Sequence, residues 1–173
     1  PDGVGLKGIR LDEGREFLAS EEIWFRPVQF AQGPDGALYV LDMYREVIEH
    51  PKSIPPIIKQ YLDLTSGRDR GRIWRVVPDN FQRRPNPALD QASTEELVQL
   101  LSHPNAWHRE TAARLIYQRQ PQEAVAPLRR LATSGEEPLG RLHALYALAG
   151  LGALDEATVL TALSDQHPRV REH

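Results

Sequence analysis

Hydrophobic and polar residues alternate over short runs in the first half of the chain, which is the spacing of β-strands. Residues 27–31 (PVQFA) and 37–41 (ALYVL) form two such runs, and the stretch Gly33-Pro34-Asp35-Gly36 lies between them. This stretch predicts a turn, because Pro34 presets φ and Gly36 accepts a positive φ. A third run at 71–77 (GRIWRVV) and two shorter ones at 9–11 and 16–18 complete the pattern of an antiparallel β-meander.

In the second half, apolar residues recur every three or four positions, which is the spacing of amphipathic helices. The pattern predicts helices over residues 94–102, 106–118, 125–132, 138–149 and 156–163, and a further helix that begins shortly before His173. Ser93 or Thr94 is the expected N-cap of the first of these helices. Gly150 is expected to cap the fourth helix at its C-terminus.

The helical half repeats itself with a period near 30 residues. Arg109, Arg141 and Arg171 are spaced by 32 and 30 residues, and the sequence LSHP at 101–104 returns as LSDQHP at 163–168. A period of this length with two helices in each repeat predicts a helical solenoid. In the first helix pair, one stripe of Leu97, Leu100 and Leu101 is expected to face a second stripe of Ala112, Leu115 and Ile116.

The periodicity changes near residue 85, where Pro85 and Pro87 interrupt the chain within the sequence RRPNP at 83–87. Proline removes a backbone donor and holds the preceding residue in an extended conformation. We therefore predict an α+β protein with one domain at residues 1–85 and a helical domain at residues 88–173.

The composition of the chain excludes several kinds of function. The net charge is −3, so no global field attracts nucleic acid. No apolar run approaches the ~18 residues that a membrane-spanning helix needs. The chain has no cysteine, which excludes disulfides, thiolate ligands, a cysteine nucleophile and a Cys-x-x-Cys-His haem attachment within these residues. The chain begins at Pro1 without a leader and stops within a repeat, so we expect it to be part of a longer protein.

Polar residues are concentrated directly after the second strand, in residues 42–50 (DMYREVIEH). If the chain turned helical there, Asp42, Glu46 and His50 would share one face, and Glu46 with His50 could form a metal pair or an acid–base pair. The alternative is an ordered exit from the sheet with the surface pairs Arg45–Glu49 and Glu46–His50, ended by Pro51. We favour the second interpretation and expect no bound metal. The candidate ligand contacts are Asp42, Tyr44, Arg45, Glu46, His50 and Arg70.

The densest basic run is RDRGRIWR at residues 68–75. Arginine beside tryptophan is compatible with base stacking, but Asp69 interrupts the run and alternation divides the arginines between two faces. We expect Arg70 or Arg72 to pair with Asp42, Asp63 or Asp69 and to fix the loop before the strand. No nucleic-acid partner is expected.

Three stretches carry a resemblance to a known family: WFRPV at 24–28, GPDGALYVLDMY at 33–44 and DRGRIWRV at 69–76. Together they resemble a closing part of a large β-propeller. Followed by HEAT-like helical pairs, the chain resembles the membrane-bound dehydrogenase-like proteins of planctomycetes and their relatives. The resemblance covers the chain from about Phe17 to His173.

The resemblance implies a propeller similar to quinone-cofactor sugar dehydrogenases, then HEAT-like repeats, often with a c-type cytochrome domain further along. It implies an exported, periplasmic protein. Because no quinone-binding position can be matched here, we expect no cofactor in these residues and place the quinone and the c-type haem in other parts of the parent protein.

We therefore expect a non-catalytic scaffold or docking segment between the propeller and an electron-transfer domain. The expected partner is the rest of the parent chain or another protein. The exposed edge of the sheet is expected to favour a homo-oligomer. The alternative is a HEAT-repeat protein–protein interaction module with no enzymatic role.

Overall fold

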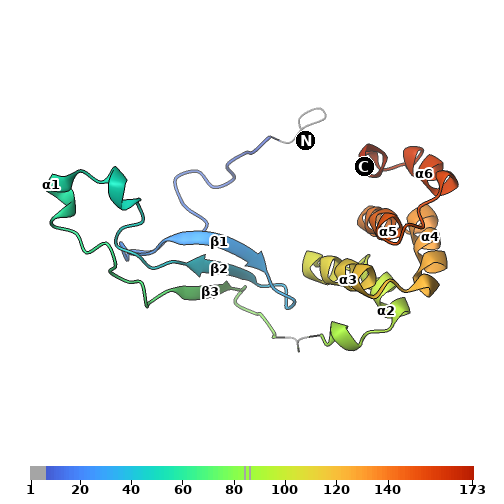
Figure 1. The fold of residues 1–173 in the computed structure, drawn as a ribbon, viewed down its shortest axis with the longest axis horizontal. Helices are drawn as coiled ribbons and strands as arrows, with labels where there is room; N and C mark the ends of the chain where they lie inside the picture. The colour runs from blue at the N-terminus through green and yellow to red at the C-terminus, as the bar shows by residue number, and fades with distance from the viewer. Residues whose placement is uncertain (1–6, 84, 86) are drawn as a thin grey trace. The chain divides into compact units, whose positions relative to one another are not determined.

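The structure is a computed structural model that describes residues 7–83, 85 and 87–173. The three strands lie in the first half of the chain, with two short helical segments between the second and the third, and the longer helices follow (Figure 1), so the fold is α+β as predicted. Two compact units are present, one of Pro1–Phe30 with Val40–Trp74 and one of Ala31–Tyr39 with Arg75–His173. The predicted domain division between residues 85 and 88 stays a prediction, and its residues Arg84 and Asn86 lie outside the described residues.

The sheet consists of β1 (Pro27–Gln32), β2 (Leu38–Asp42) and β3 (Arg72–Val76), in the order β1-β2-β3. All three strands were predicted within one residue at each end. The predicted turn is also confirmed, because Gly36 has φ +86° and the Gly36 N–H donates to the Gly33 carbonyl over 3.0 Å. The sheet is open and has three strands, so a propeller is not shown.

The predicted strands at 9–11 and 16–18 are wrong, since residues 7–26 contain no regular strand. Arg10 instead holds this segment in a local loop, donating to the backbone oxygens of Asp12 and Arg15 and to the Glu16 carboxylate. The apolar side chains of the two runs find no cover, and Leu11 and Phe17 are 90% and 75% exposed. A short apolar run without a neighbouring strand has no ladder to join.

The chain does not turn helical after Leu41, which was the condition for Asp42, Glu46 and His50 to share one face. Residues 43–50 form no helix, and Tyr44 has φ +50°, in the left-handed region that does not continue an α-helix. Two prolines further along the chain begin short helices. Pro51 is the first residue of η1 (Pro51–Ser53) and Pro56 the first of α1 (Pro56–Lys59), a position at which the missing N–H costs nothing.

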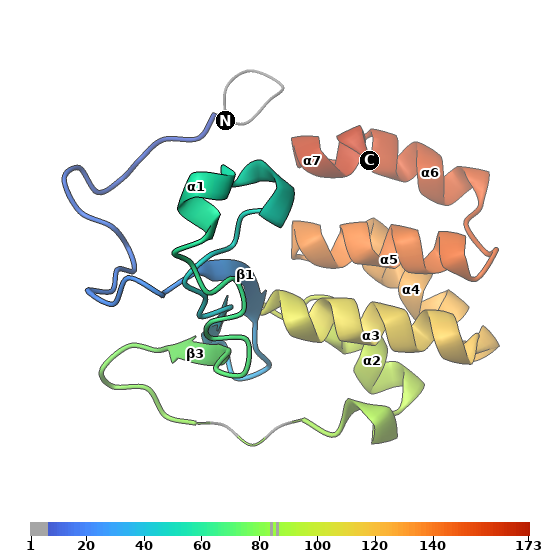
Figure 2. The same ribbon diagram turned by 60° about the vertical axis from the view of Figure 1, so that its left-hand side comes forward.

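The helical part contains three antiparallel pairs. They are α2 (Thr94–Leu100) with α3 (Ala106–Arg119), α4 (Val125–Ser134) with α5 (Pro138–Gly150), and α6 (Glu156–Leu163) with α7 (Pro168–Glu172). Short 3₁₀ turns precede two of them, η2 (Leu89–Gln91) and η3 (Gln122–Ala124). Figure 2 shows α3, α5 and α7 stacked in succession, as expected of a solenoid.

The helix boundaries follow from local chemistry. Ser93 caps α2 in a reciprocal capping box with Glu96, which selects Ser93 from the two predicted caps. Gly150 is the last residue of α5 rather than its cap, and the positive φ, +64°, falls two residues later at Gly152. Four residues of the two predicted stripes, Leu97, Leu101, Ala112 and Ile116, are fully buried, whereas Leu100 and Leu115 are partly buried and pack against the same core.

Candidate functional site

Asp42 ends β2 with a buried carboxylate, whose side chain has no exposed surface. Oδ1 accepts the backbone N–H groups of Arg26 (2.8 Å) and Tyr44 (2.9 Å). Oδ2 accepts Arg72 Nε and the Trp74 indole N–H, both at 3.1 Å. Burial by itself raises the pKa of Asp42, but these donors outweigh it and hold the pKa below its usual value. Asp42 therefore stays ionised and joins the end of β2 to β3 and to the segment before β1.

Arg72 lies at the centre of this cluster. Its Nη2 is 3.0 Å from Asp42 Oδ2 and 2.9 Å from Glu22 Oε2, and its guanidinium lies 3.9 Å from the centre of the Tyr44 ring. The pairing of Arg72 with Asp42 confirms one of the pairs predicted from the sequence.

Tyr44 completes the cluster through its hydroxyl, which donates to Glu22 Oε1. This hydrogen bond, and next the one from Arg72, lower the pKa of Glu22. The same bond to Glu22 raises the pKa of Tyr44. Tyr44 is also one of two described non-glycine residues with positive φ. The cluster of Glu22, Asp42, Tyr44, Arg72 and Trp74 is thus a paired polar network, suited to fixing a chain exit rather than to proton transfer.

The structure brings together two of the six predicted contact residues, Asp42 and Tyr44. Arg45 instead donates Nη2 to the Leu64 carbonyl, and His50 accepts the Lys52 N–H as the cap of η1. The predicted pairs Arg45–Glu49 and Glu46–His50 required a helix that does not form. Glu46 takes part through its backbone oxygen, which accepts Arg26 Nη2 at 3.4 Å.

Arg70 lies in the turn that precedes β3 and adds positive charge near Tyr44. Three residues of this region were not among the contact residues predicted from the sequence: Glu22, Arg26 and Trp74. Alternation in β3 carried a signal for Trp74, since it places Arg72 and Trp74 on the same face.

In the helical unit, the three repeating arginines share one structural role. Arg109, Arg141 and Arg171 each donate Nη1 to the backbone oxygens six and five residues earlier, at 2.6–2.7 Å and 2.8–3.1 Å. Those oxygens belong to the turn between the two helices of each pair, so each arginine closes its own turn. This regularity confirms the repeat that the sequence indicated.

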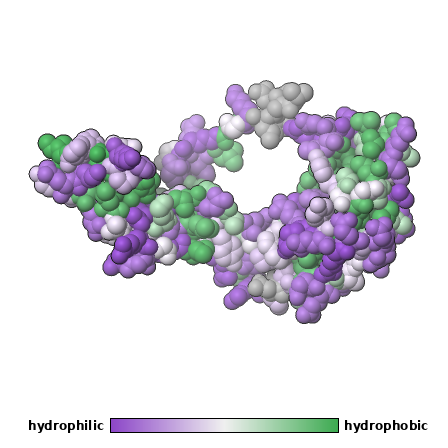
Figure 3. Space-filling view, viewed as in Figure 1, coloured by the Kyte–Doolittle hydropathy of each residue, from purple (hydrophilic) through white to green (hydrophobic). Residues whose placement is uncertain are grey.

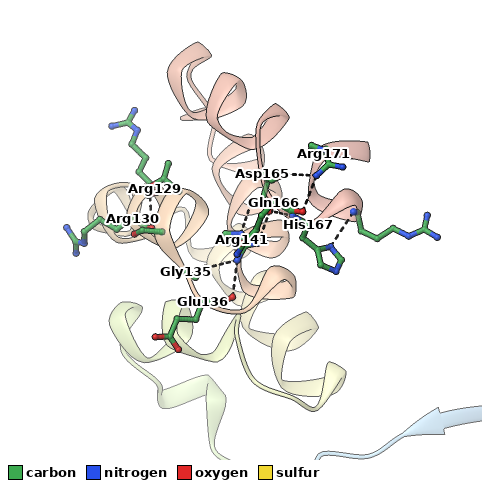
Figure 4. Close-up of polar contacts among 12 residues, drawn as sticks. Arg129, Arg130, Gly135, Glu136, Arg141, Asp165, Gln166, His167 and Arg171 are labelled. Atoms are coloured by element: carbon green, nitrogen blue, oxygen red, sulfur yellow. Dashed lines mark hydrogen bonds and ion pairs between the residues drawn. The ribbon is translucent and has the colours of Figure 1, made fainter. Parts of the chain in front are cut away.

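Arg141 makes a further contact with the following repeat, shown in Figure 4. Its Nε and Nη2 lie 2.6 Å and 2.7 Å from the two carboxylate oxygens of Asp165. The side chains are only 4% and 9% exposed, so this is a buried two-point ion pair. The hydrogen bond from Arg141 is the main reason that the pKa of Asp165 lies below its usual value. In the repeat before, Arg109 instead donates Nε to His143 over 3.4 Å, which is the interhelical bond that a histidine inside a helix needs.

A cleft of about 780 Å³ opens at this ion pair, between the end of α4 and α6. Thr133, Ser134 and Thr161 contribute hydroxyls to its wall, but each donates to a backbone oxygen of its own helix. These three hydroxyls are therefore already paired within their own helices.

An apolar surface lies elsewhere in the helical unit. We call it the α5 face and define it by Leu139, Leu142, Tyr146 and Ala149, which share one side of α5, with Tyr117 from α3. Tyr117, Leu139 and Tyr146 are 62%, 50% and 57% exposed. Tyr117 lies against the end of α5, where a Cβ at Gly150 would come within 3.0 Å of its ring. Beside Tyr146 is a pocket of about 230 Å³, lined mainly by leucine and alanine side chains.

The part of the α5 face that lies on α5 presents no exposed charged side chain. The helix contains no acidic residue, and its arginine, Arg141, is buried. Hydrophobic surface is visible among the hydrophilic surface of both units in Figure 3. Exposed tyrosines beside a small apolar pocket are the kind of anchor site that protein partners use.

Comparison with known families adds two matches. Residues 1–80 match the family model described as a domain of unknown function (DUF7133), and residues 94–173 match the model of HEAT repeats. No match was found among curated proteins or among solved structures. The first match covers the part of the chain that contains the three strands, and the second covers the part that forms the three helix pairs.

Within the described part of the chain, no helix combines the length and the apolar character needed to cross a membrane.

Proposed function

We propose that this chain is a protein-interaction module that binds a protein partner through the α5 face. One observation carries the proposal: the stack of helix pairs buries a continuous core and yet leaves Tyr117, Leu139 and Tyr146 at least half exposed on one side. HEAT-type solenoids form extended surfaces for binding other proteins. Tyrosine gives large contact area at low entropic cost and is enriched among residues that dominate binding.

The resemblance to membrane-bound dehydrogenase-like proteins supports a more specific proposal. In it, the β-containing part is the closing blade of a propeller, and the HEAT-type repeats hold that propeller against an electron-transfer domain of the same exported, periplasmic protein. The quinone cofactor and the c-type haem belong to those other parts. The hydrogen bonds of Asp42 support this assignment of the redox centre to other parts of the protein, because the Asp42 carboxylate already accepts four N–H donors.

The rival proposal is an interaction module in a protein without any enzymatic role. The complete reading frame separates the two, because further propeller strands with site residues upstream favour the redox protein, whereas further helical repeats favour the adaptor. For the redox proposal we expect the chain alone to reduce no dye with sugars as electron donors. Measurable dye reduction would contradict the assignment of the redox centre to other parts of the protein.

The binding proposal is tested by quantitative capture with three forms of the chain. The wild type is compared with Leu139→Ala/Tyr146→Ala, which removes the centre of the α5 face, and with Val159→Ala/Leu160→Ala. The control pair is 38% and 57% exposed on α6, so it removes exposed apolar area away from the proposed face.

We expect one defined protein from extracts of the source organism to bind the wild type and the α6 control. Its binding to the α5 variant should fall at least tenfold, and the same ranking should hold with that protein purified. Equal binding of the purified protein to all three forms would refute the α5 face as the binding site.

A further inference from the structure

The turn between β1 and β2 is bound by two side chains at the start of α3. Residues 31–39 belong to the same compact unit as the helices. Asn105 donates Nδ2 to the Gly33 oxygen at 2.9 Å, and His108 Nε2 lies 2.9 Å from the Pro34 oxygen. From these contacts we infer that Asn105 and His108 form a latch, which closes on the turn or releases it as a unit. This inference does not depend on the proposed role of the α5 face.

The turn keeps its shape without the latch. The Gly36 N–H donates to the Gly33 oxygen over 3.0 Å. The Asp35 carboxylate accepts the Ala37 N–H at 3.1 Å and the Tyr39 hydroxyl at 3.2 Å. All three bonds lie inside the turn segment, so releasing the latch breaks none of them.

Hydrogen bonds rather than apolar packing hold the turn on α3. Among the described residues, the hydrophobic core of the helical part includes none from the turn segment. A cavity of about 890 Å³ is lined by residues of the turn and of the start of α3, including Pro34, Gly36, His103 and His108. A segment with few buried apolar contacts opens at a low free energy. Two side chains are therefore enough to decide whether the turn is held.

His108 makes release of the turn less costly. The Pro34 carbonyl can only accept, so Nε2 of His108 carries the proton and Nδ1 is the bare acceptor. Nδ1 is buried and has no hydrogen-bond partner among the described residues, a state that costs free energy. In the released state the ring can turn toward solvent and Nδ1 can bind water, which offsets part of the lost bonds.

Asn105 uses different atoms for α3 and for the turn. Its Oδ1 accepts the Trp107 N–H at 2.9 Å and caps the helix, whereas its Nδ2 binds the turn. Aspartate caps helices as well as asparagine does, but it has no N–H to donate to the Gly33 oxygen. Asn105→Asp therefore weakens the latch and keeps the helix cap. His108→Phe keeps a ring at the second position and removes its donor.

The test measures distances between spin labels in the full chain by double electron–electron resonance. The chain has no cysteine, so labels can be attached to introduced pairs. Gln32→Cys/Gln118→Cys joins the end of β1 to the end of α3 and reports the latch. Gln118→Cys/Glu156→Cys joins two helices and is the matched control for the stack. All three sites are exposed.

We expect one narrow distance for the latch pair in the parent chain. In Asn105→Asp/His108→Phe the fraction of molecules at other distances should rise at least tenfold, while the control pair stays unchanged. If circular dichroism shows that this double variant loses helix, Asn105→Ser keeps a capping hydroxyl without the donor and should show the same rise.

An unchanged narrow distance for the latch pair in these variants would overturn the inference. So would a broad distance distribution in the parent chain, because the turn would then not be held. A change in both label pairs would also overturn it, since the helical stack itself would have loosened.

Discussion

Replacing Arg141 with methionine should destabilise the helical unit more than the same change at any other repeat arginine. The substitution keeps an apolar stem of similar length but removes four hydrogen bonds, two to Asp165 and one each to the Gly135 and Glu136 oxygens. It leaves a carboxylate that is 9% exposed without its cation. Breaking a buried ion pair from one side costs about 3–5 kcal/mol.

The matched control is Arg109→Met. Arg109 makes the same two bonds to its own turn, to the His103 and Pro104 oxygens, but its further contact is the neutral ring of His143 at 3.4 Å. Its loss leaves no buried charge, so we expect about 1–3 kcal/mol. The two variants should therefore differ by about 2 kcal/mol in the free energy of unfolding.

The assay is urea-induced unfolding followed by far-ultraviolet circular dichroism, which reports the helices. A second variant, Arg141→Met/Asp165→Leu, removes both charges. It should recover part of the free energy of unfolding that Arg141→Met loses, because no isolated carboxylate then remains buried. Equal losses for Arg141→Met and Arg109→Met would refute the reasoning. So would a double variant that is less stable than Arg141→Met.

Two further predictions concern acid stability and the sheet exit. The lowered pKa of Asp165 contributes stability that is complete above the unfolded value of about 3.9 and is lost as the pH falls below it. The stability gap between wild type and Asp165→Asn should therefore narrow below pH ~4 in acid titrations followed by circular dichroism; a constant gap would contradict the ion pair. Asp42→Ala removes the acceptor of the Arg26 and Tyr44 amides, so hydrogen exchange should speed up about tenfold around these residues and stay unchanged in α2–α7. Unchanged exchange near Arg26 would show that Asp42 does not organise the exit.

Much of the helical part could be predicted because its local and global signals agree. Capping residues, apolar spacing and a repeat of about 30 residues all gave the same boundaries, and α6 was predicted without error at either end. The strands of the sheet were predicted because a recognisable turn joins two of them and alternation marks the third.

Sequence spacing misled where one side chain binds a backbone N–H that a helix would otherwise use. Spacing alone allowed a helix from Asp42 onward, but the Asp42 carboxylate binds the N–H of Tyr44 two residues later and Tyr44 adopts a positive φ. Such a local bond favours a turn over a helix. Glu22 could not be assigned to the cluster, because it is 50 residues from Arg72 in sequence and meets it only after the chain has folded.

The turn contacts of the repeat arginines have a consequence for how such a chain can change in length. Arg109, Arg141 and Arg171 each reach back within their own repeat, so a repeat could be duplicated or deleted together with its turn and remain self-consistent. The bond from Arg141 to Asp165 crosses into the next repeat, while at the earlier junction Gly135 stands where Asp165 stands at the later one. The two junctions between repeats are therefore not interchangeable, because only the later one has a carboxylate, Asp165, that binds the arginine of the preceding repeat.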